Sequence, residues 1–186
     1  MSALLRRWHA CLLFLVAAAV AFNVQAATPE HIASELPKAR MAGSGTFRYF
    51  GLEIYDATLW VGPNGYRPAA STIEKFALDL RYARTFQGKR IAARSTDEME
   101  KLKLGSVAQR AEWNGRMTAL FPDVVEGTHI TGVYLPKEGA RFYSDGKLLG
   151  DILDPEFGQA FFAIWLDPKT TGGPLRDALL ANAAPR

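Results

Sequence analysis

The residue types that usually carry enzymatic chemistry are sparse in this 186-residue chain. No Gly-x-Ser-x-Gly nucleophile motif occurs, and Gly43–Gly45 lacks the third glycine of a dinucleotide-binding loop. The acidic residues between Asp151 and Glu156 are close together, but the start of a helix explains them better than a pair of catalytic carboxylates. The sequence therefore identifies no catalytic residue and no cofactor.

Metal-binding side chains are also few. The single cysteine, Cys11, lies in an N-terminal segment that we expect to be removed, and only His31 and His129 remain beyond it. Isolated histidines are far more often surface or structural residues than zinc ligands. We expect neither a metal site nor a disulfide in the mature protein.

One charged residue stands in an unusual setting. Arg48 lies between Phe47 and Tyr49 in a segment with the composition of a β-strand. A guanidinium there either points to solvent or faces an anion inside the protein, because burial of an unpaired charge is costly. The pattern alone favours the outward orientation, since arginine is seldom fully buried.

Other residues qualify as site candidates on position alone. Trp60 and Trp113 can each form the floor of a cleft. Lys89, Arg90 and Arg94 can approach a site entrance, but a solvated helix start accounts for them more simply.

The elements that must position these residues are predicted by periodicity. Alternating or β-branched and aromatic runs predict strands over residues 40–49, 51–61, 76–82, 129–135, 140–143 and 147–153. In the third run, Phe76, Leu78, Leu80 and Tyr82 share one face, with Asp79 and Arg81 on the other. This alternation is typical of an antiparallel strand with one face on a core.

Helices are predicted by capping residues and by 3.6-residue periodicity. Ser95 and Glu98 have the spacing of a capping box, which predicts a helix that begins there. A second helix is predicted from about Ser106 to Phe121, and Asp154 with Pro155 predicts the start of a third. The core face of this third helix is predicted to be Phe157, Ala160, Phe161, Ile164 and Trp165, and Pro174 begins a last short helix. Strands followed by helices indicate an α+β fold, with an antiparallel sheet and helices on one face.

The N-terminus has the three parts of a secretion signal. Arg6 and Arg7 precede an apolar run from Cys11 to Phe22, and small residues stand before a cleavage position after Ala26. The run is shorter than the roughly 20 residues that a membrane span needs. We therefore expect residues 1–26 to be a cleavable signal peptide, residues 27–186 to be a single domain in the periplasm, and no stable membrane insertion after cleavage.

Charge gives little indication of an acidic partner. Removal of Arg6 and Arg7 lowers the basic residues from 22 to 20 against 19 acidic residues, so the formal charge falls from +3 to +1. No basic cluster remains, and we expect no nucleic-acid partner.

The segments predicted to form the first two strands resemble those of a known family. Gly43 to Arg48, followed by Gly51 to Trp60, resembles the opening strand pair of the chalcone isomerase-like superfamily, in particular its exported bacterial branch. Further matching segments follow in the same order, ending with Leu175-Arg176 and Leu179-Leu180. The resemblance covers roughly residues 38 to 180 and implies an open-faced β-sandwich: a large antiparallel sheet, helices on one face and a ligand cleft between them.

The resemblance also implies a site. In the plant isomerases an arginine on the opening strand faces the cleft, and the related fatty-acid-binding branch uses an arginine there against a carboxylate. Arg48 matches that position, although its spacing differs by one residue from the plant form. We therefore expect Arg48 to face the cleft, with Tyr55, Tyr82 and Trp113 as further ligand-binding residues.

The departures from the family bear on catalysis. The plant active site has a threonine on the second strand, and the nearest residue here is Tyr55. It also has a tyrosine at the start of the helix after the third strand, and the corresponding segment here, Gln87–Ile91, contains no tyrosine. The leading interpretation is a non-catalytic binder of a small amphipathic anion, such as a fatty acid or an aromatic acid. The alternatives are an isomerase or intramolecular lyase on an unknown substrate, and an accessory protein that docks another envelope component.

Overall fold

The computed structural model describes residues 27–67 and 74–184. The predicted signal peptide, residues 1–26, lies outside the described residues. Within the described part of the chain, none of the helices is long and apolar enough to cross a membrane.

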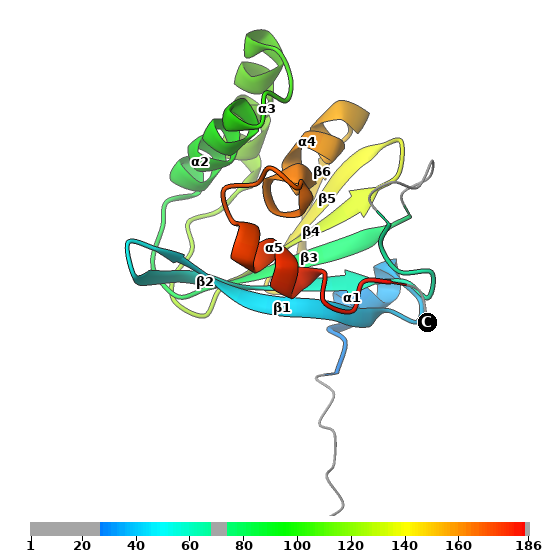
Figure 1. Cartoon of the computed structure of the whole chain (residues 1–186). Helices are drawn as coiled ribbons and strands as arrows, with labels where there is room; N and C mark the ends of the chain where they lie inside the picture. Colours follow the sequence, from blue (N-terminus) through cyan, green and yellow to red (C-terminus); the bar gives the residue numbers. More distant parts are fainter. Residues whose placement is uncertain (1–26, 68–73, 185–186) are drawn as a thin grey trace, which may run out of the picture.

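A single sheet forms the framework of the fold (Figure 1). Its six strands are antiparallel and follow one another in sequence order, each hydrogen-bonded to the next. They are β1 (Arg40–Tyr49), β2 (Leu52–Val61), β3 (Phe76–Tyr82), β4 (His129–Leu135), β5 (Gly139–Ser144) and β6 (Lys147–Ile152). Every predicted strand is confirmed, with bounds that differ by one residue at most.

Four helices lie on one face of this sheet (Figure 1). They are α2 (Gly88–Lys101), α3 (Val107–Leu120), α4 (Pro155–Leu166) and α5 (Gly173–Leu179). The expected α+β fold, an open-faced sheet with helices packed on one face, is therefore confirmed. A short helix that the sequence analysis did not predict, α1 (Glu30–Glu35), packs on the opposite face.

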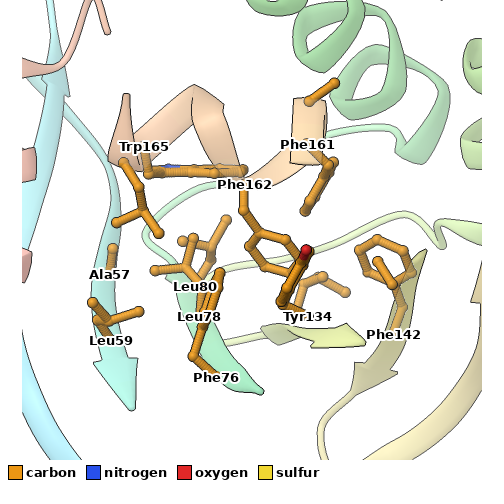
Figure 2. Close-up of a cluster of buried hydrophobic side chains, with 14 of the residues drawn as sticks. Ala57, Leu59, Phe76, Leu78, Leu80, Tyr134, Phe142, Phe161, Phe162 and Trp165 are labelled. Atoms are coloured by element: carbon orange, nitrogen blue, oxygen red, sulfur yellow. The ribbon is translucent and has the colours of Figure 1, made fainter. Parts of the chain in front are cut away.

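The main core lies between α4 and the centre of the sheet. Figure 2 shows Phe161, Phe162 and Trp165 of α4 on the side of the sheet toward which Phe76, Leu78 and Leu80 of β3 point. These six side chains are all buried. Of the stripe predicted for α4, Phe157, Ala160, Phe161 and Trp165 are buried, and Ile164 is partly buried against the same core.

The predicted start of α2 is wrong. The helix begins at Gly88, and both Ser95 and Glu98 are buried inside it. The Ser95 hydroxyl donates to the carbonyl oxygen of Ile91 at 3.0 Å instead of capping a helix. The first amide of α2, that of Gly88, donates to the carboxylate of Asp123 at 2.9 Å. This cap comes from a residue 35 positions further on, so no local pattern reveals it.

Two other helix starts follow local rules. Ser106 caps α3 in a reciprocal capping box with Gln109, whose amide and side chain both take part. Asp154 caps α4, where its carboxylate accepts from the amides of Glu156 and Phe157. The starts predicted at Ser106 and Asp154 are therefore confirmed.

Of the two polar residues on the second face of β3, Arg81 is exposed and Asp79 is not. Asp79 is buried, because α1 lies above it. Its carboxylate accepts from Thr131 at 2.7 Å and meets the imidazole of His129 at 2.7 Å. His31 of α1 joins this group through Thr131 at 2.9 Å. The sheet therefore carries a polar network under α1 on the face opposite to the main core.

The C-terminal helix α5 lies against β1 at a close approach. A Cβ atom at Gly43 would stand 2.0 Å from the carbonyl oxygen of Ala178 in α5. Glycine is required there, because no larger residue leaves room for the helix backbone. This contact places α5 over the edge strand and brings the loop before it to the main face of the sheet.

Candidate functional site

A cavity of about 450 Å³ lies between the sheet and its helices. Strands β1–β4 contribute one wall, and α2, α4 and α5 with the segment leading into it contribute the others. Most of its lining is apolar or aromatic. The residues that line it are Phe47, Tyr49, Ile54, Tyr55, Leu80, Tyr82, Phe86, Arg90, Ile91, Arg94, Ser95, Glu98, Phe121, Ile130, Phe161, Ile164, Trp165, Thr170, Thr171, Gly172 and Leu175.

Two of the predicted site residues, Tyr55 and Tyr82, stand side by side in this cavity. They are paired across β2 and β3, and their ring centres are 5.9 Å apart in an edge-to-face arrangement. The indole Nε1 of Trp165 donates to the Tyr55 hydroxyl at 3.0 Å. Among the described residues the Tyr82 hydroxyl has no hydrogen-bond partner.

Burial raises the pKa of both hydroxyls well above the ordinary value for tyrosine. Tyr55 and Tyr82 therefore stay neutral at physiological pH. A neutral phenol offers a ligand one O–H donor and an acceptor oxygen, without adding a charge to the apolar interior.

The expectation that Arg48 faces the cavity is wrong. Its side chain is 57% exposed, lies outside the cavity lining and forms an ion pair with Glu53 at 3.0 Å. Its neighbours Phe47 and Tyr49 both line the cavity. Because successive side chains of a strand point to opposite faces, the residue between these two aromatics points to solvent.

The expectation that Trp113 lines the cleft is wrong as well. Trp113 lies on α3, is only 1% exposed and takes no part in the cavity lining. Its indole Nε1 donates to Asp154 at 2.8 Å, and its ring contacts Phe157 edge-to-face. Trp113 is a core residue that ties α3 to the start of α4. Trp60 is also buried, but in the cluster beneath α1.

The cations that do line the cavity are Arg90 and Arg94, one turn apart on α2. Both side chains are exposed, so they stand at the mouth of the cavity rather than in its depth. Arg94 contacts Glu98 at 2.6 Å and lies over the ring of Tyr49, 5.5 Å from its centre. Arg90 makes no ion pair or side-chain hydrogen bond with any described residue. The sequence analysis assigned both to a solvated helix start.

Glu98 is the one acid among the described residues of the lining, and both of its carboxylate oxygens have partners. It accepts from Lys101 at 2.9 Å and from Thr171 at 2.8 Å, in addition to its contact with Arg94. Burial alone would raise the pKa of this carboxyl, but these hydrogen bonds and the neighbouring positive charges lower it below the ordinary value. Glu98 is therefore an ionised structural anchor that holds the loop before α5 against α2.

A metal site is not apparent in the described ranges, 27–67 and 74–184. Within them no group of three or more His, Cys, Asp or Glu side chains is placed to hold a metal ion. The polar groups at the cavity are the carboxylate of Glu98, neutral hydroxyls and two guanidinium groups. Because Glu98 pairs with Arg94, the guanidinium of Arg90 is the group suited to an organic anion.

Comparison with known proteins supports the assignment made from the first strands. The sequence matches the family described as chalcone isomerase-like over residues 23–181. Among solved structures, a fatty-acid binding protein of Arabidopsis thaliana superposes with a TM-score of 0.64, covering 79% of this chain and 89% of that chain at 13% identity. No match was found among curated proteins. The structural likeness concerns the fold, and the family match spans most of the sequence. The chain therefore belongs to the chalcone isomerase-like family.

Proposed function

We propose that the protein binds a small amphipathic carboxylate, most simply a fatty acid, with its apolar tail in the cavity and its carboxylate at Arg90. One observation carries this proposal: an apolar cavity opens beside a guanidinium that has no partner among the described residues. In this proposal Arg90 of α2 takes the anion-binding role first expected of Arg48 on β1.

The interior suits an apolar tail. Leu80, Ile130, Phe121 and Phe161 are buried and line the cavity together. A volume of about 450 Å³ falls in the range of roughly 300–1,000 Å³ that is usual for small-molecule sites. Each methylene buried in such a space stabilises the complex by about 0.8 kcal/mol.

The mouth suits an anionic head group. Arginine presents a planar array of donors that matches the two oxygens of a carboxylate. Arg90 is exposed, so the carboxylate can pair with it while remaining partly hydrated. This arrangement avoids the cost of moving a charge into the interior, where Tyr55 and Tyr82 offer neutral hydroxyls and the ionised Glu98 would repel an anion.

Two further observations support the proposal. The structural neighbour from Arabidopsis thaliana is a fatty-acid binding protein, on the same fold. The N-terminal sequence has the parts of a secretion signal, so we place the site of action in the periplasm. An exported protein with a cavity of this kind would carry or buffer a poorly soluble acid between membranes.

The proposal is tested by titrating the mature protein with dodecanoate, hexadecanoate and dodecan-1-ol while following tryptophan fluorescence. Trp165 lines the cavity and reports on occupancy. We expect saturable binding of both acids, tighter for the longer chain, and binding of the alcohol about tenfold weaker than that of dodecanoate. Equal binding of acid and alcohol would show that the carboxylate contributes nothing to the affinity, which would contradict an anion site at Arg90. Absence of saturable binding of either acid would contradict it altogether.

A further inference from the structure

The turn between β1 and β2 carries an unusual apolar surface. Three large side chains, which we call the hairpin tip, project from it into solvent: Tyr49 is 48% exposed, Phe50 88% and Leu52 51%. Figure 1 shows this hairpin reaching outward beyond the neighbouring strands, at the left of the view. A cluster of exposed aromatic and aliphatic side chains of this kind commonly marks a surface for interaction.

The backbone of the tip is also unusual. Phe50 has a φ of +48° and Gly51 a φ of +77°, which is the pattern of a tight two-residue hairpin turn. Asparagine or glycine normally occupies the first of these positions, because a bulky side chain is strained at positive φ. The sequence thus places an aromatic residue where it weakens the turn and is almost wholly in water. Among the residues that the structure describes, its one ring contact is with Tyr49 of the same tip, edge-to-face with the ring centres 4.5 Å apart.

Basic residues surround the tip. Arg94 lies over the ring of Tyr49, and Arg84 donates to the backbone carbonyl of Glu53 at 2.9 Å. Arg48 contacts the carboxylate of Glu53 at 3.0 Å. The segments 47–54 and 84–94 together contain five basic residues and one acidic residue, Glu53, although the whole chain has nearly balanced charge. The apolar tip is therefore set in a positively charged surround.

The tip adjoins the mouth of the cavity. Tyr49 belongs both to the tip and to the cavity lining, and Arg94 joins it from α2. A flat surface that touched the tip would therefore lie against the entrance. Aromatic and aliphatic side chains beside lysine and arginine are the composition of segments that sit at the interface of an anionic bilayer.

We propose that the hairpin tip docks the protein on the surface of an anionic lipid bilayer, with the cavity entrance turned to the membrane. Phe50 and Leu52 enter the boundary between head groups and acyl chains, while the surrounding arginines contact the anionic head groups. This inference stands independently of the proposed function, since it rests on the exposed tip and its charges rather than on any ligand.

The test is co-sedimentation of ligand-free mature protein with vesicles of phosphatidylcholine alone and of phosphatidylcholine with one third phosphatidylglycerol. We expect binding to the anionic vesicles, at least tenfold weaker binding to the neutral ones, and loss of binding in high salt. The variant Phe50→Asn should bind the anionic vesicles about tenfold or more weakly, since burial of this ring is lost. Asparagine suits the backbone at this position, so the variant keeps its fold.

The matched control is Val107→Asn, which removes another exposed apolar side chain on α3, away from the tip. It should leave vesicle binding within about twofold of the unmodified protein. Absence of binding to anionic vesicles, or an equal loss in the two variants, would overturn the inference. Sedimentation that revealed a dimer dissociated by Phe50→Asn would also overturn it, by assigning the tip to a second copy of the chain.

Discussion

Trp165 of α4 donates its indole N–H to the hydroxyl of Tyr55 on β2, at 3.0 Å, within the wall of the cavity. The bond joins the helical layer directly to the sheet at the edge of the cavity. It fixes the orientation of Tyr55, leaves the phenolic proton available to a ligand and keeps a buried indole N–H satisfied. The bond thus fixes the part of the cavity wall where α4 meets β2.

The first prediction concerns this contact. Tyr55→Phe removes the acceptor and leaves the Trp165 N–H without its partner, so we expect a loss of about 1–3 kcal/mol in the free energy of unfolding. Urea denaturation measures the change. Tyr82→Phe is the control, because the Tyr82 hydroxyl has no hydrogen bond within the described residues, and the change should cost less than about 0.5 kcal/mol. Equal losses in the two variants would show that the bond to Trp165 does not hold the wall.

The second prediction concerns the packing of α5 on β1. Gly43→Ala places a methyl group against the backbone carbonyl of Ala178, so helix or strand must shift, and we expect a destabilisation of about 1–3 kcal/mol. Gly115→Ala on α3 meets nothing within 4 Å and should instead stabilise the protein by about 0.5–1 kcal/mol. Thermal unfolding of the two variants should therefore shift in opposite directions. A neutral Gly43→Ala would refute the close approach.

The third prediction concerns acid stability through Glu35 of α1. Burial alone would raise its pKa, but hydrogen bonds from Tyr143, Arg141 and Lys75 lower the pKa of this carboxyl to about 2. Because the folded-state pKa is lower than the ordinary value of 4.5, the unfolded chain binds the proton more readily. The stabilisation by ionised Glu35 is therefore complete above pH 4.5 and is lost as the pH falls toward about 2.

Urea denaturation of Glu35→Gln between pH 7 and pH 2.5 measures this contribution. The variant should be less stable than the unmodified protein at pH 7, and the difference should shrink steadily below pH 4.5. Glu30→Gln is the control on the same helix, since Glu30 is exposed and no ion pair to it occurs among the described residues. A difference that stayed constant over the whole range would contradict the assigned role of Glu35.

The strands were predictable because their β-branched and aromatic residues and the turns between them are local features of the sequence, even though β3 and β4 are buried on both faces. Helix α4 was predictable for a similar reason, since Asp154 and Pro155 mark its start and Phe157 begins its apolar stripe. The start of α2 was not, because its cap is Asp123, which only the fold brings to Gly88. Helix α1 was missed because it has barely more than one turn and is held by contacts across the sheet.

The site was predictable only in part. Tyr55 and Tyr82 were expected at the cavity and lie there, because their strands pair and both side chains point to the helical face. Arg48 was assigned to the cavity by family resemblance, against the pattern of its own strand. A displacement of one residue moves a side chain to the other face of a sheet, and the one-residue difference in spacing was the available warning. Arg90 was passed over because its role depends on the position of α2 over the sheet.

Calorimetric titration of dodecanoate into Arg90→Gln and Arg48→Gln tests the central claim most directly. Both variants remove one guanidinium from an exposed position, so they change the net charge equally. We expect Arg90→Gln to weaken binding about five- to tenfold, since a partly exposed ion pair is lost, and Arg48→Gln to change it by less than about twofold. Weakened binding in Arg48→Gln with none in Arg90→Gln would contradict the account and return the anion site to β1.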